Sequence, residues 1–221
     1  KSISGLYPPG STIKPIVALS ALEFDVISTK LVVECKGSME MHGQKYHCWK
    51  KKGHGFMGLK NAIKQSCDIY FYEVARRLGI DRMSITAKRF GLGQKILPDF
   101  IEEKKGIVPD VKWKLKNKGR GWVLGETLIS GIGQGYFQAT PLQLCLMTAQ
   151  LANNGFKVKP RIIEDGTVSY EDIEEFKKQA FEKRENKNVQ EGLINSDSFN
   201  LGRFKSLFRN QENIKFVKDA M

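Results

Sequence analysis

The sequence has no long apolar run, no leader and no repeat. None of its 221 residues falls in a stretch near the roughly 20 continuous apolar residues that a membrane-spanning helix needs. No N-terminal segment has the pattern of a secretory signal peptide, and no stretch recurs at a fixed period. These absences argue against a membrane-spanning chain and against a repeat protein, so we expect the chain as given to be soluble.

Acidic residues are in the minority. The chain has 36 Lys and Arg against 24 Asp and Glu, a formal net charge of +12. This excess suits nucleic acid, an anionic membrane or an anionic polymer such as cell wall. The positive charge is spread out, with small clusters at 50–52 and 104–120, so a basic surface without a specific partner fits equally well. An apolar content of 41% indicates a globular protein, long enough for one domain with a real core.

Apolar spacing and capping residues predict a mostly helical chain. The expected helices cover 13–24, 59–65, 69–78, 81–90 and 141–154, the last with Thr140 as N-cap and Gln143 completing a capping box. We expect irregular chain at 30–57 and 98–125, a strand-like start to "TLISGIGQGYFQATP" and a short strand at "FKVKPRII". Composition divides the chain into a core (1–163), a charged insertion (164–213) and the start of a core helix (214–221).

The stretch "YPPGSTIKP" places Ser11 three residues before Lys14, at the start of a predicted buried helix. Residues at this spacing lie on one face of a helix. A serine hydroxyl is a poor nucleophile until a base takes its proton, and a lysine accepts a proton only in its neutral form, which burial favours. The pair is therefore a candidate nucleophile and base, although S-x-x-K also occurs by chance in the first turn of ordinary helices.

The context of this pair resembles the penicillin-binding proteins, a superfamily that carries S-x-x-K. A second motif of the S-x-N or S-x-D type is matched by "SCD" at Ser66–Asp68. "WKKKGHG", "SCDIYFYEVARRLGID", "GLG", "GIGQGYFQATPLQL" and "NNGFKVKP" follow in the order of the class B transpeptidases. "GHG" and the S-x-D form are similar to the elongation-specific subfamily, penicillin-binding protein 2. The likeness covers 4–163 and the final "VKDAM".

The resemblance implies an α+β fold of the beta-lactamase/transpeptidase type, here a mostly helical part with an incomplete antiparallel sheet. It implies a peptidoglycan D,D-transpeptidase in which Ser11 attacks stem peptides, Lys14 is the base, Ser66 relays a proton and Asp68 holds Lys14 or substrate. Beta-lactams would acylate the same serine. It further implies a parent protein anchored in the bacterial inner membrane, facing the periplasm and partnered by a SEDS-family glycosyltransferase, with no nucleic acid involved.

The third motif of the superfamily, K-[ST]-G, is missing from this sequence. The motif would supply substrate contacts and one oxyanion donor. We therefore expect poor acylation of Ser11, a sheet edge left open, and a chain that is a piece of something longer. A serine beta-lactamase or beta-lactam sensor with the same S-x-x-K remains an alternative, as does a non-catalytic basic zinc-binding module.

Three of the four cysteines and all three histidines lie between positions 35 and 67. Cys35, Cys48, His54 and Cys67 form a set of three thiols and one imidazole, which suits a closed tetrahedral zinc site of structural type. The family resemblance implies the same site, beside the catalytic residues. A Cys35–Cys48 disulfide is the alternative, and His42 and His47 are substitute ligands. Cys145 is expected to pack as a small apolar residue.

Overall fold

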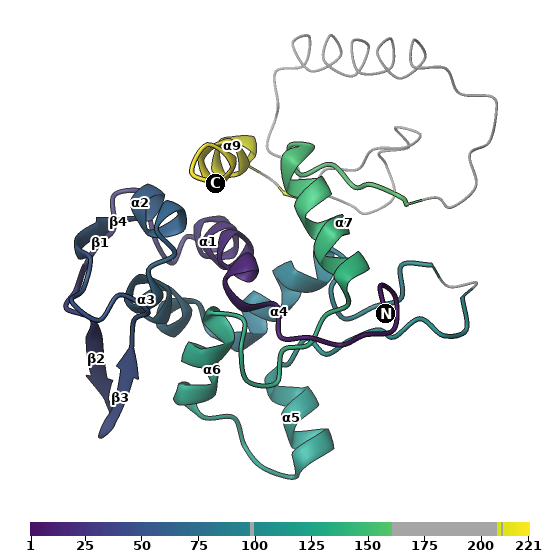
Figure 1. Ribbon diagram of the computed structural model, residues 1–221, viewed down its shortest axis with the longest axis horizontal. Coiled ribbons are helices and arrows are strands. Elements are labelled where there is room, and N and C mark those ends of the chain that lie inside the picture. The colour runs from purple at the N-terminus through teal and green to yellow at the C-terminus, as the bar shows by residue number, and fades with distance from the viewer. Residues whose placement is uncertain (98–99, 161–206, 209) are drawn as a thin grey trace, which may run out of the picture. The chain divides into compact units, whose positions relative to one another are not determined.

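Helix α1 (Lys14–Glu23) is the helix around which the others assemble, and all ten of its residues are buried. It packs against α3, α4 and α9 (Figure 1). The structure, a computed structural model, describes residues 1–97, 100–160, 207–208 and 210–221. The described helices are η1 (Gly10–Ile13, a 3-10 turn), α1, α2 (Leu59–Lys64), α3 (Asp68–Leu78), α4 (Ile80–Arg89), α5 (Val111–Lys118), α6 (Leu124–Gly131), α7 (Pro141–Ala152) and α9 (Gln211–Lys218).

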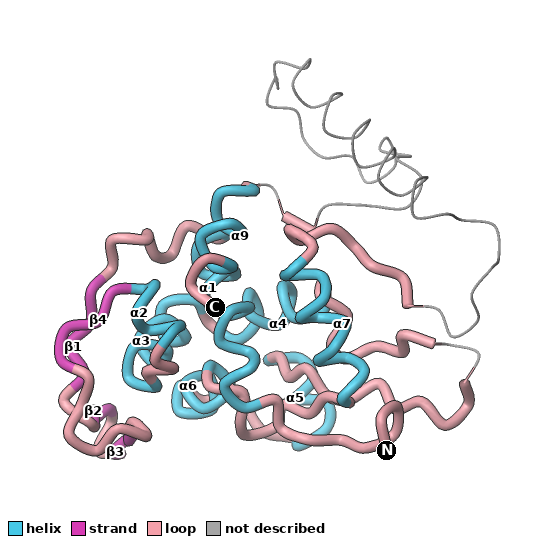
Figure 2. Tube along the Cα trace, turned by 45° about the horizontal axis from the view of Figure 1, so that its top comes forward, coloured by secondary structure: helices cyan, strands magenta, loops and turns pink. Residues whose placement is uncertain are grey.

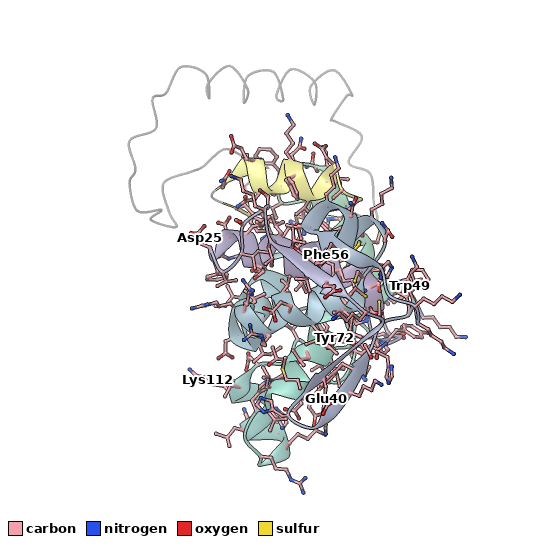
Figure 3. The ribbon with its side chains drawn as sticks, turned by 90° about the vertical axis from the view of Figure 1, so that its left-hand side faces the viewer. Asp25, Glu40, Trp49, Phe56, Tyr72 and Lys112 are labelled. Carbon is pink, nitrogen blue, oxygen red and sulfur yellow. The ribbon has the colours of Figure 1, made fainter. Side chains whose placement is uncertain are left out.

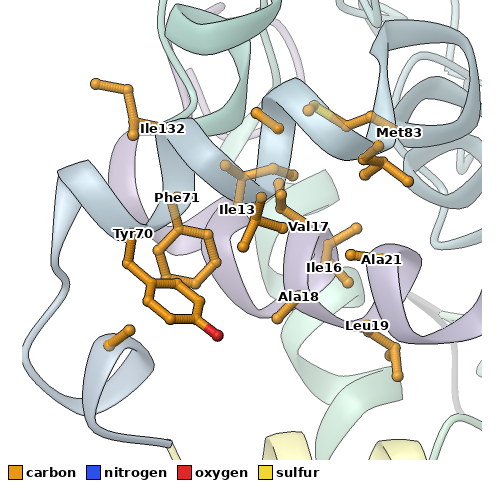
Figure 4. Packing of buried hydrophobic residues seen from close by; sticks show 14 of the residues in the cluster. Ile13, Ile16, Val17, Ala18, Leu19, Ala21, Tyr70, Phe71, Met83 and Ile132 are labelled. Atoms are coloured by element: carbon orange, nitrogen blue, oxygen red, sulfur yellow. The ribbon is translucent and has the colours of Figure 1, made fainter. Parts of the chain in front are cut away.

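The core lies around α1 because this helix is apolar on every side. Ile13, Ile16 and Val17 are fully buried, as are Tyr70 and Phe71 of α3 (Figure 4). Pro15 sits in the first turn, where its missing N–H breaks no helical hydrogen bond. The prediction of a buried helix at 13–24 is thus confirmed. Lys14, in the first turn of this helix, is buried and does not extend into solvent.

The helix break at "SCD" also follows the prediction. Helix α2 ends at Lys64, α3 begins at Asp68, and Ser66 between them adopts a positive φ of 51°. A non-glycine residue in this region is uncommon and is held there by its surroundings. The break therefore forms a tight corner that presents Ser66 and Asp68 beside the start of α1.

Two antiparallel ribbons make up the described sheet structure (Figure 2). Strand β1 (Val32–Cys35) pairs with β4 (Gly55–Gly58), and β2 (Ser38–Met41) pairs with β3 (Gln44–His47). The helix-rich chain with a small antiparallel sheet confirms the expected fold class. The expectation of irregular chain at 30–57 was wrong, because four-residue strands are too short for their alternation to stand out in a sequence.

Three further expectations are corrected. The segment at 98–125 contains α5, whose N-cap Asp110 accepts a hydrogen bond from the Trp113 amide at 2.7 Å. "TLISG" continues α6 instead of starting a strand, because its packing against α3 overrides the β-branched residues. Residues 156–160 form no strand of the described sheets, and 161–163 lie outside the described residues.

Helix α7 begins at its predicted cap, and helix α9 begins close to its predicted start. In α7, Thr140 Oγ1 accepts from the Gln143 amide and Gln143 Oε1 accepts from the Thr140 amide, the predicted capping box. Helix α9 begins at Gln211, slightly before the predicted start. The charged insertion lies mostly outside the described residues. None of the helices that the structure describes has both the length and the apolar character to cross a bilayer.

Candidate active site

The side chain of Lys14 is buried and directed at the "SCD" corner. Its Nζ donates to Asp68 Oδ1 at 2.6 Å, to Ser66 Oγ at 2.9 Å and to the Ser66 carbonyl at 2.9 Å. Lys14 is 1% exposed, and its Nζ lies 5.6 Å from the centre of the Phe71 ring. All three N–H donors of an ammonium group thus have an acceptor. The structure brings together three of the four predicted catalytic side chains.

Ser11 lies on η1, one turn before Lys14, and its carbonyl accepts a hydrogen bond from the Lys14 amide. Ser11 is exposed, and no described residue makes a side-chain hydrogen bond to its hydroxyl. Its side chain lines the same pocket as Ser66 and Asp68. The fourth predicted residue is therefore accessible to a substrate at the place where the other three meet.

The pocket has a volume of about 620 Å³. It is lined by Ser11, His47, Cys48, Trp49, Ser66, Asp68, Tyr72, Ile132 and Gln134. Tyr72 donates its hydroxyl to the His47 carbonyl at 3.3 Å, and burial raises the pKa of Tyr72 to about 12. Tyr72 is therefore a neutral wall of the pocket at any ordinary pH, and it ties α3 to the end of β3.

Trp49 connects the loop after β3 to the "SCD" corner. Its amide donates to Asp68 Oδ2 at 2.9 Å, and its indole N–H lies 3.1 Å from the carbonyls of Gln65 and Ser66. The side chain is 63% exposed and stands at the edge of the molecule (Figure 3). This tryptophan was not singled out from the sequence, although its position next to Cys48, a predicted ligand, was a signal for a role at the site.

The glycine-rich turn after α6 places η1, and with it Ser11. The Gly10 amide donates to the Gly133 carbonyl at 2.9 Å. A Cβ at Gly133 would lie 2.2 Å from the Gly10 carbonyl oxygen, and φ is +73° there. Only glycine fits so close to another backbone. "GIGQG" is therefore a tight backbone turn, and it positions the segment that carries Ser11.

Gly133→Ala is expected to destabilise the chain more than Gly135→Ala and to displace Ser11. Both glycines have φ of +73°, so the backbone strain of about 1 kcal/mol is shared. The nearest atom to a Cβ at Gly135 is Ile129 Cγ2 at 3.4 Å, whereas a Cβ at Gly133 clashes with Gly10. Urea unfolding should show an extra loss of about 2 kcal/mol for Gly133→Ala. Equal losses for the two variants would contradict this account.

The four predicted metal ligands form one cluster beside the corner. The donor atoms of Cys35, Cys48, His54 and Cys67 all lie within 4.8 Å of one another. His54 Nδ1 is 3.5 Å from both Cys35 Sγ and Cys48 Sγ. Zinc bonds of about 2.0 Å to nitrogen and 2.3 Å to sulfur place tetrahedral ligand atoms roughly 3.5–3.8 Å apart. The donor set therefore fits a tetrahedral zinc ion.

The surroundings of the cluster also fit a metal ion. The three cysteines are buried and free, so they form no disulfide. Burial and then the charge of Lys50 hold the pKa of His54 below its usual value, which keeps the imidazole neutral, the form that binds metals. Burial raises the pKa of the Cys67 thiol, and a cation would favour the thiolate instead. His42 and His47 are exposed and lie outside the cluster.

Each ligand is positioned by a different element. Cys35 ends β1 and pairs with Gly55, which brings His54 alongside it. Cys48 follows β3, and Cys67 is the N-cap residue of α3. The cluster thus joins the two ribbons to the corner that carries Ser66 and Asp68. Cys145 on α7 is exposed, so the expectation that it packs as a small apolar residue was wrong.

Comparison with known proteins gives a consistent answer. Residues 1–215 match the family model described as the penicillin-binding protein transpeptidase domain. The peptidoglycan D,D-transpeptidase MrdA of Acinetobacter baumannii is 41% identical over 165 residues, which cover 74% of this chain and 25% of the relative. The chain thus spans about a quarter of the length of this curated relative.

Two solved structures share this fold and more than a third of their aligned residues with this chain. Pseudomonas aeruginosa PBP2, solved in complex with WCK 5153, has a TM-score of 0.75 and 36% identity over 98% of this chain and 44% of its own. Helicobacter pylori PBP2, solved in complex with MreC, has a TM-score of 0.71 and 39% identity over 76% of this chain and 32% of its own. The family match over residues 1–215 includes η1, α1 and the "SCD" corner.

Proposed function

We propose, on the premise that this chain belongs to the penicillin-binding protein transpeptidase family, that its pocket is the acyl-transfer site of a peptidoglycan D,D-transpeptidase acting in cell elongation. The observation that carries the proposal is the buried Lys14 side-chain nitrogen, held by Ser66 and Asp68 beside the pocket that Ser11 lines. A hydroxyl, an amine and a second hydroxyl in one pocket are the groups that serine acyl transfer needs.

In the proposed reaction, the Ser11 hydroxyl oxygen forms a bond to the carbonyl carbon of the penultimate D-Ala in a stem peptide. Lys14 in its neutral form accepts the Ser11 proton and passes it through the Ser66 hydroxyl, 2.9 Å away, to the departing nitrogen, so that the peptide bond to the terminal D-Ala breaks and Lys14 and Ser66 return to their starting forms. Asp68 orients Lys14, and the Ser11 amide helps to stabilise the oxyanion. An amine of a neighbouring strand then attacks the ester and releases Ser11.

The proposed substrates and partners follow from this chemistry. Peptidoglycan stem peptides are the substrates, and beta-lactams are inhibitors because opening their strained amide leaves the same ester on Ser11. Cross-linking consumes newly polymerised strands, so a SEDS-family glycosyltransferase of the elongation complex is the proposed partner. The parent protein would then act at the periplasmic face of the bacterial inner membrane, through an anchor outside this chain.

We also propose that Cys35, Cys48, His54 and Cys67 hold a structural Zn²⁺ ion. A closed set of four protein ligands leaves no open position for water, so the ion supplies rigidity and no nucleophile. The supporting observation is the spacing of the donor atoms around His54 Nδ1. The role of these residues is to fix the loop after β3 against Cys67, and thereby Ser66 and Asp68.

The function is tested by incubating the chain with a fluorescent penicillin and locating the adduct by peptide mass spectrometry. We expect a single adduct on Ser11 that needs the folded chain. The readout is the residue that carries the adduct and not the rate of acylation. The sequence has no K-[ST]-G motif, and loss of one oxyanion donor slows acylation about 10²–10³-fold. An adduct elsewhere, or equal labelling of urea-unfolded chain, would contradict the proposal. Rapid hydrolysis of the adduct would indicate a beta-lactamase.

A further inference from the structure

A group of exposed cations without described ion-pair partners directly follows a residue that lines the pocket. Lys50, Lys51 and Lys52 directly follow the pocket-lining Trp49, and all three are exposed. None of the three forms an ion pair with a described residue, whereas Lys36 and Lys88 pair with Glu34 and Asp110. Nitrogen-tipped side chains fan out from the edge where Trp49 lies (Figure 3). We call Lys50–Lys52 the basic turn.

The backbone of the basic turn is held in place. The Gly53 amide donates to the Lys50 carbonyl at 2.8 Å, which closes the turn, and the Cys48 amide donates to the Gly37 carbonyl at 2.9 Å. A Cβ at Gly37 would lie 2.0 Å from the Lys51 carbonyl oxygen, so the turn packs directly on the backbone between β1 and β2. Cys48 and His54 of the cysteine–histidine cluster flank it. The three cations therefore project from a fixed base.

An exposed aromatic surface adjoins these cations. The Trp49 ring lies 5.3 Å from the His54 ring in an edge arrangement, and its indole N–H is committed to the carbonyls of Gln65 and Ser66. The ring is thus fixed while 63% of the residue stays open to solvent. A fixed aromatic face beside several ammonium groups suits an extended chain that carries both apolar stems and carboxylates.

We propose that the basic turn and Trp49 form a subsite that binds carboxylates of an acidic peptide strand entering the pocket. The inference rests on the proposed function and specifies how its peptide substrate is recognised. Its position favours a peptide over a nucleic acid or a membrane, because the turn directly follows Cys48 and Trp49, which line the same pocket as Ser11. Binding of the other polyanions becomes an outcome of the test.

The experiment measures fluorescence anisotropy of two labelled pentapeptides with the 221-residue chain at low salt. One peptide carries two side-chain carboxylates, and the other carries amides at the same positions. The test variant is Lys50→Gln/Lys51→Gln/Lys52→Gln. The control is Lys60→Gln/Lys112→Gln/Lys116→Gln, which removes the same charge from exposed lysines that belong to α2 and α5.

We expect the test variant to bind the acidic peptide about 10-fold more weakly, since the exposed ion pairs to its two side-chain carboxylates are lost. The control variant should change by less than about 2-fold, and the amide peptide should bind both variants alike. Salt should weaken binding of the acidic peptide to the wild type but not to the test variant. A further arm uses a single-stranded oligonucleotide and phosphatidylglycerol vesicles.

Equal weakening in the two triple variants would overturn the proposal, because general charge would then explain the binding. Loss of oligonucleotide or vesicle binding in the test variant, with peptide binding intact, would overturn it as well. These measurements do not depend on acylation. Failure of penicillin to label Ser11 would therefore contradict the proposed function. The anisotropy measurements would still decide whether the basic turn binds peptide carboxylates.

Discussion

With Lys14 replaced by methionine, acylation of Ser11 is expected to fall by at least about 10³-fold while the chain still folds. General acid–base groups contribute about 10²–10⁴-fold to such reactions. Methionine is a similar volume without the charge, so the packing against Phe71 is kept. The measurement is the rate of penicillin adduct formation by mass spectrometry, with circular dichroism to verify the fold.

Lys14→Met is also expected to lower the free energy of unfolding. A matched variant shows whether this loss of stability, and not the loss of a catalytic group, explains the loss of acylation. Removing Lys14 leaves Asp68, 13% exposed, without its cation, a loss of about 3 kcal/mol. Lys114 is the matching residue: its Nζ lies 2.6 Å from Glu126 Oε1, with 6% of its side chain exposed. Lys114→Met should lose similar stability in urea unfolding but keep acylation within about 3-fold. If both variants lose acylation equally, Lys14 is structural and the catalytic account is wrong.

Zinc is expected to raise the unfolding temperature of the metal-stripped chain by about 10 °C. A ligand at a thousand times its dissociation constant stabilises the folded state by about 4 kcal/mol, and a domain of this size gains about 2–4 °C per kcal/mol. Cys67→Ser should abolish the gain, because it removes the thiol of a fully buried predicted ligand at the N-cap position of α3. The measurement is differential scanning calorimetry with one equivalent of zinc, and with chelator.

Cys145→Ser is the control, since this cysteine is exposed and lies outside the cluster. It should leave the gain from zinc unchanged, and elemental analysis should find one zinc per chain in both the wild type and this variant. A gain that survives in Cys67→Ser would show that zinc binds elsewhere. If zinc does not raise the unfolding temperature of the wild type, the metal proposal is wrong. The cluster would then be three buried thiols and an imidazole without an ion.

Features written into local sequence were predictable here. The buried helix at 13–24, the break at "SCD" and the capping box of Thr140 and Gln143 depend on residues a few positions apart, and the structure confirms all three. The grouping of Cys35, Cys48, His54 and Cys67 was also predicted, because so many metal-ligating side chains in one window are unusual. Each of these cases needs only spacing and side-chain chemistry.

Features that depend on distant partners were not predictable. Strands β1 and β4 pair across the intervening ribbon, and neither carries enough alternation to show alone. "TLISG" is helical because Gly131 lets α6 lie close to Ala75 of α3, a contact that sequence spacing does not reveal. The role of Trp49 likewise depends on a corner that lies 17 residues later in the chain. Tertiary contacts override local preference at such places.

The hydrogen bonds of Asp68 restrict what position 68 can be. One oxygen faces the Lys14 ammonium and the other faces the Trp49 amide, so both neighbours are donors. A carboxylate accepts on both sides, but an asparagine in either flip would turn its own NH₂ towards one of them. The residue required at position 68 thus depends on a residue outside the "SCD" motif. Because the backbone N–H of Trp49, in the loop that carries Cys48, donates to the second oxygen of residue 68, that residue has to be aspartate and not asparagine.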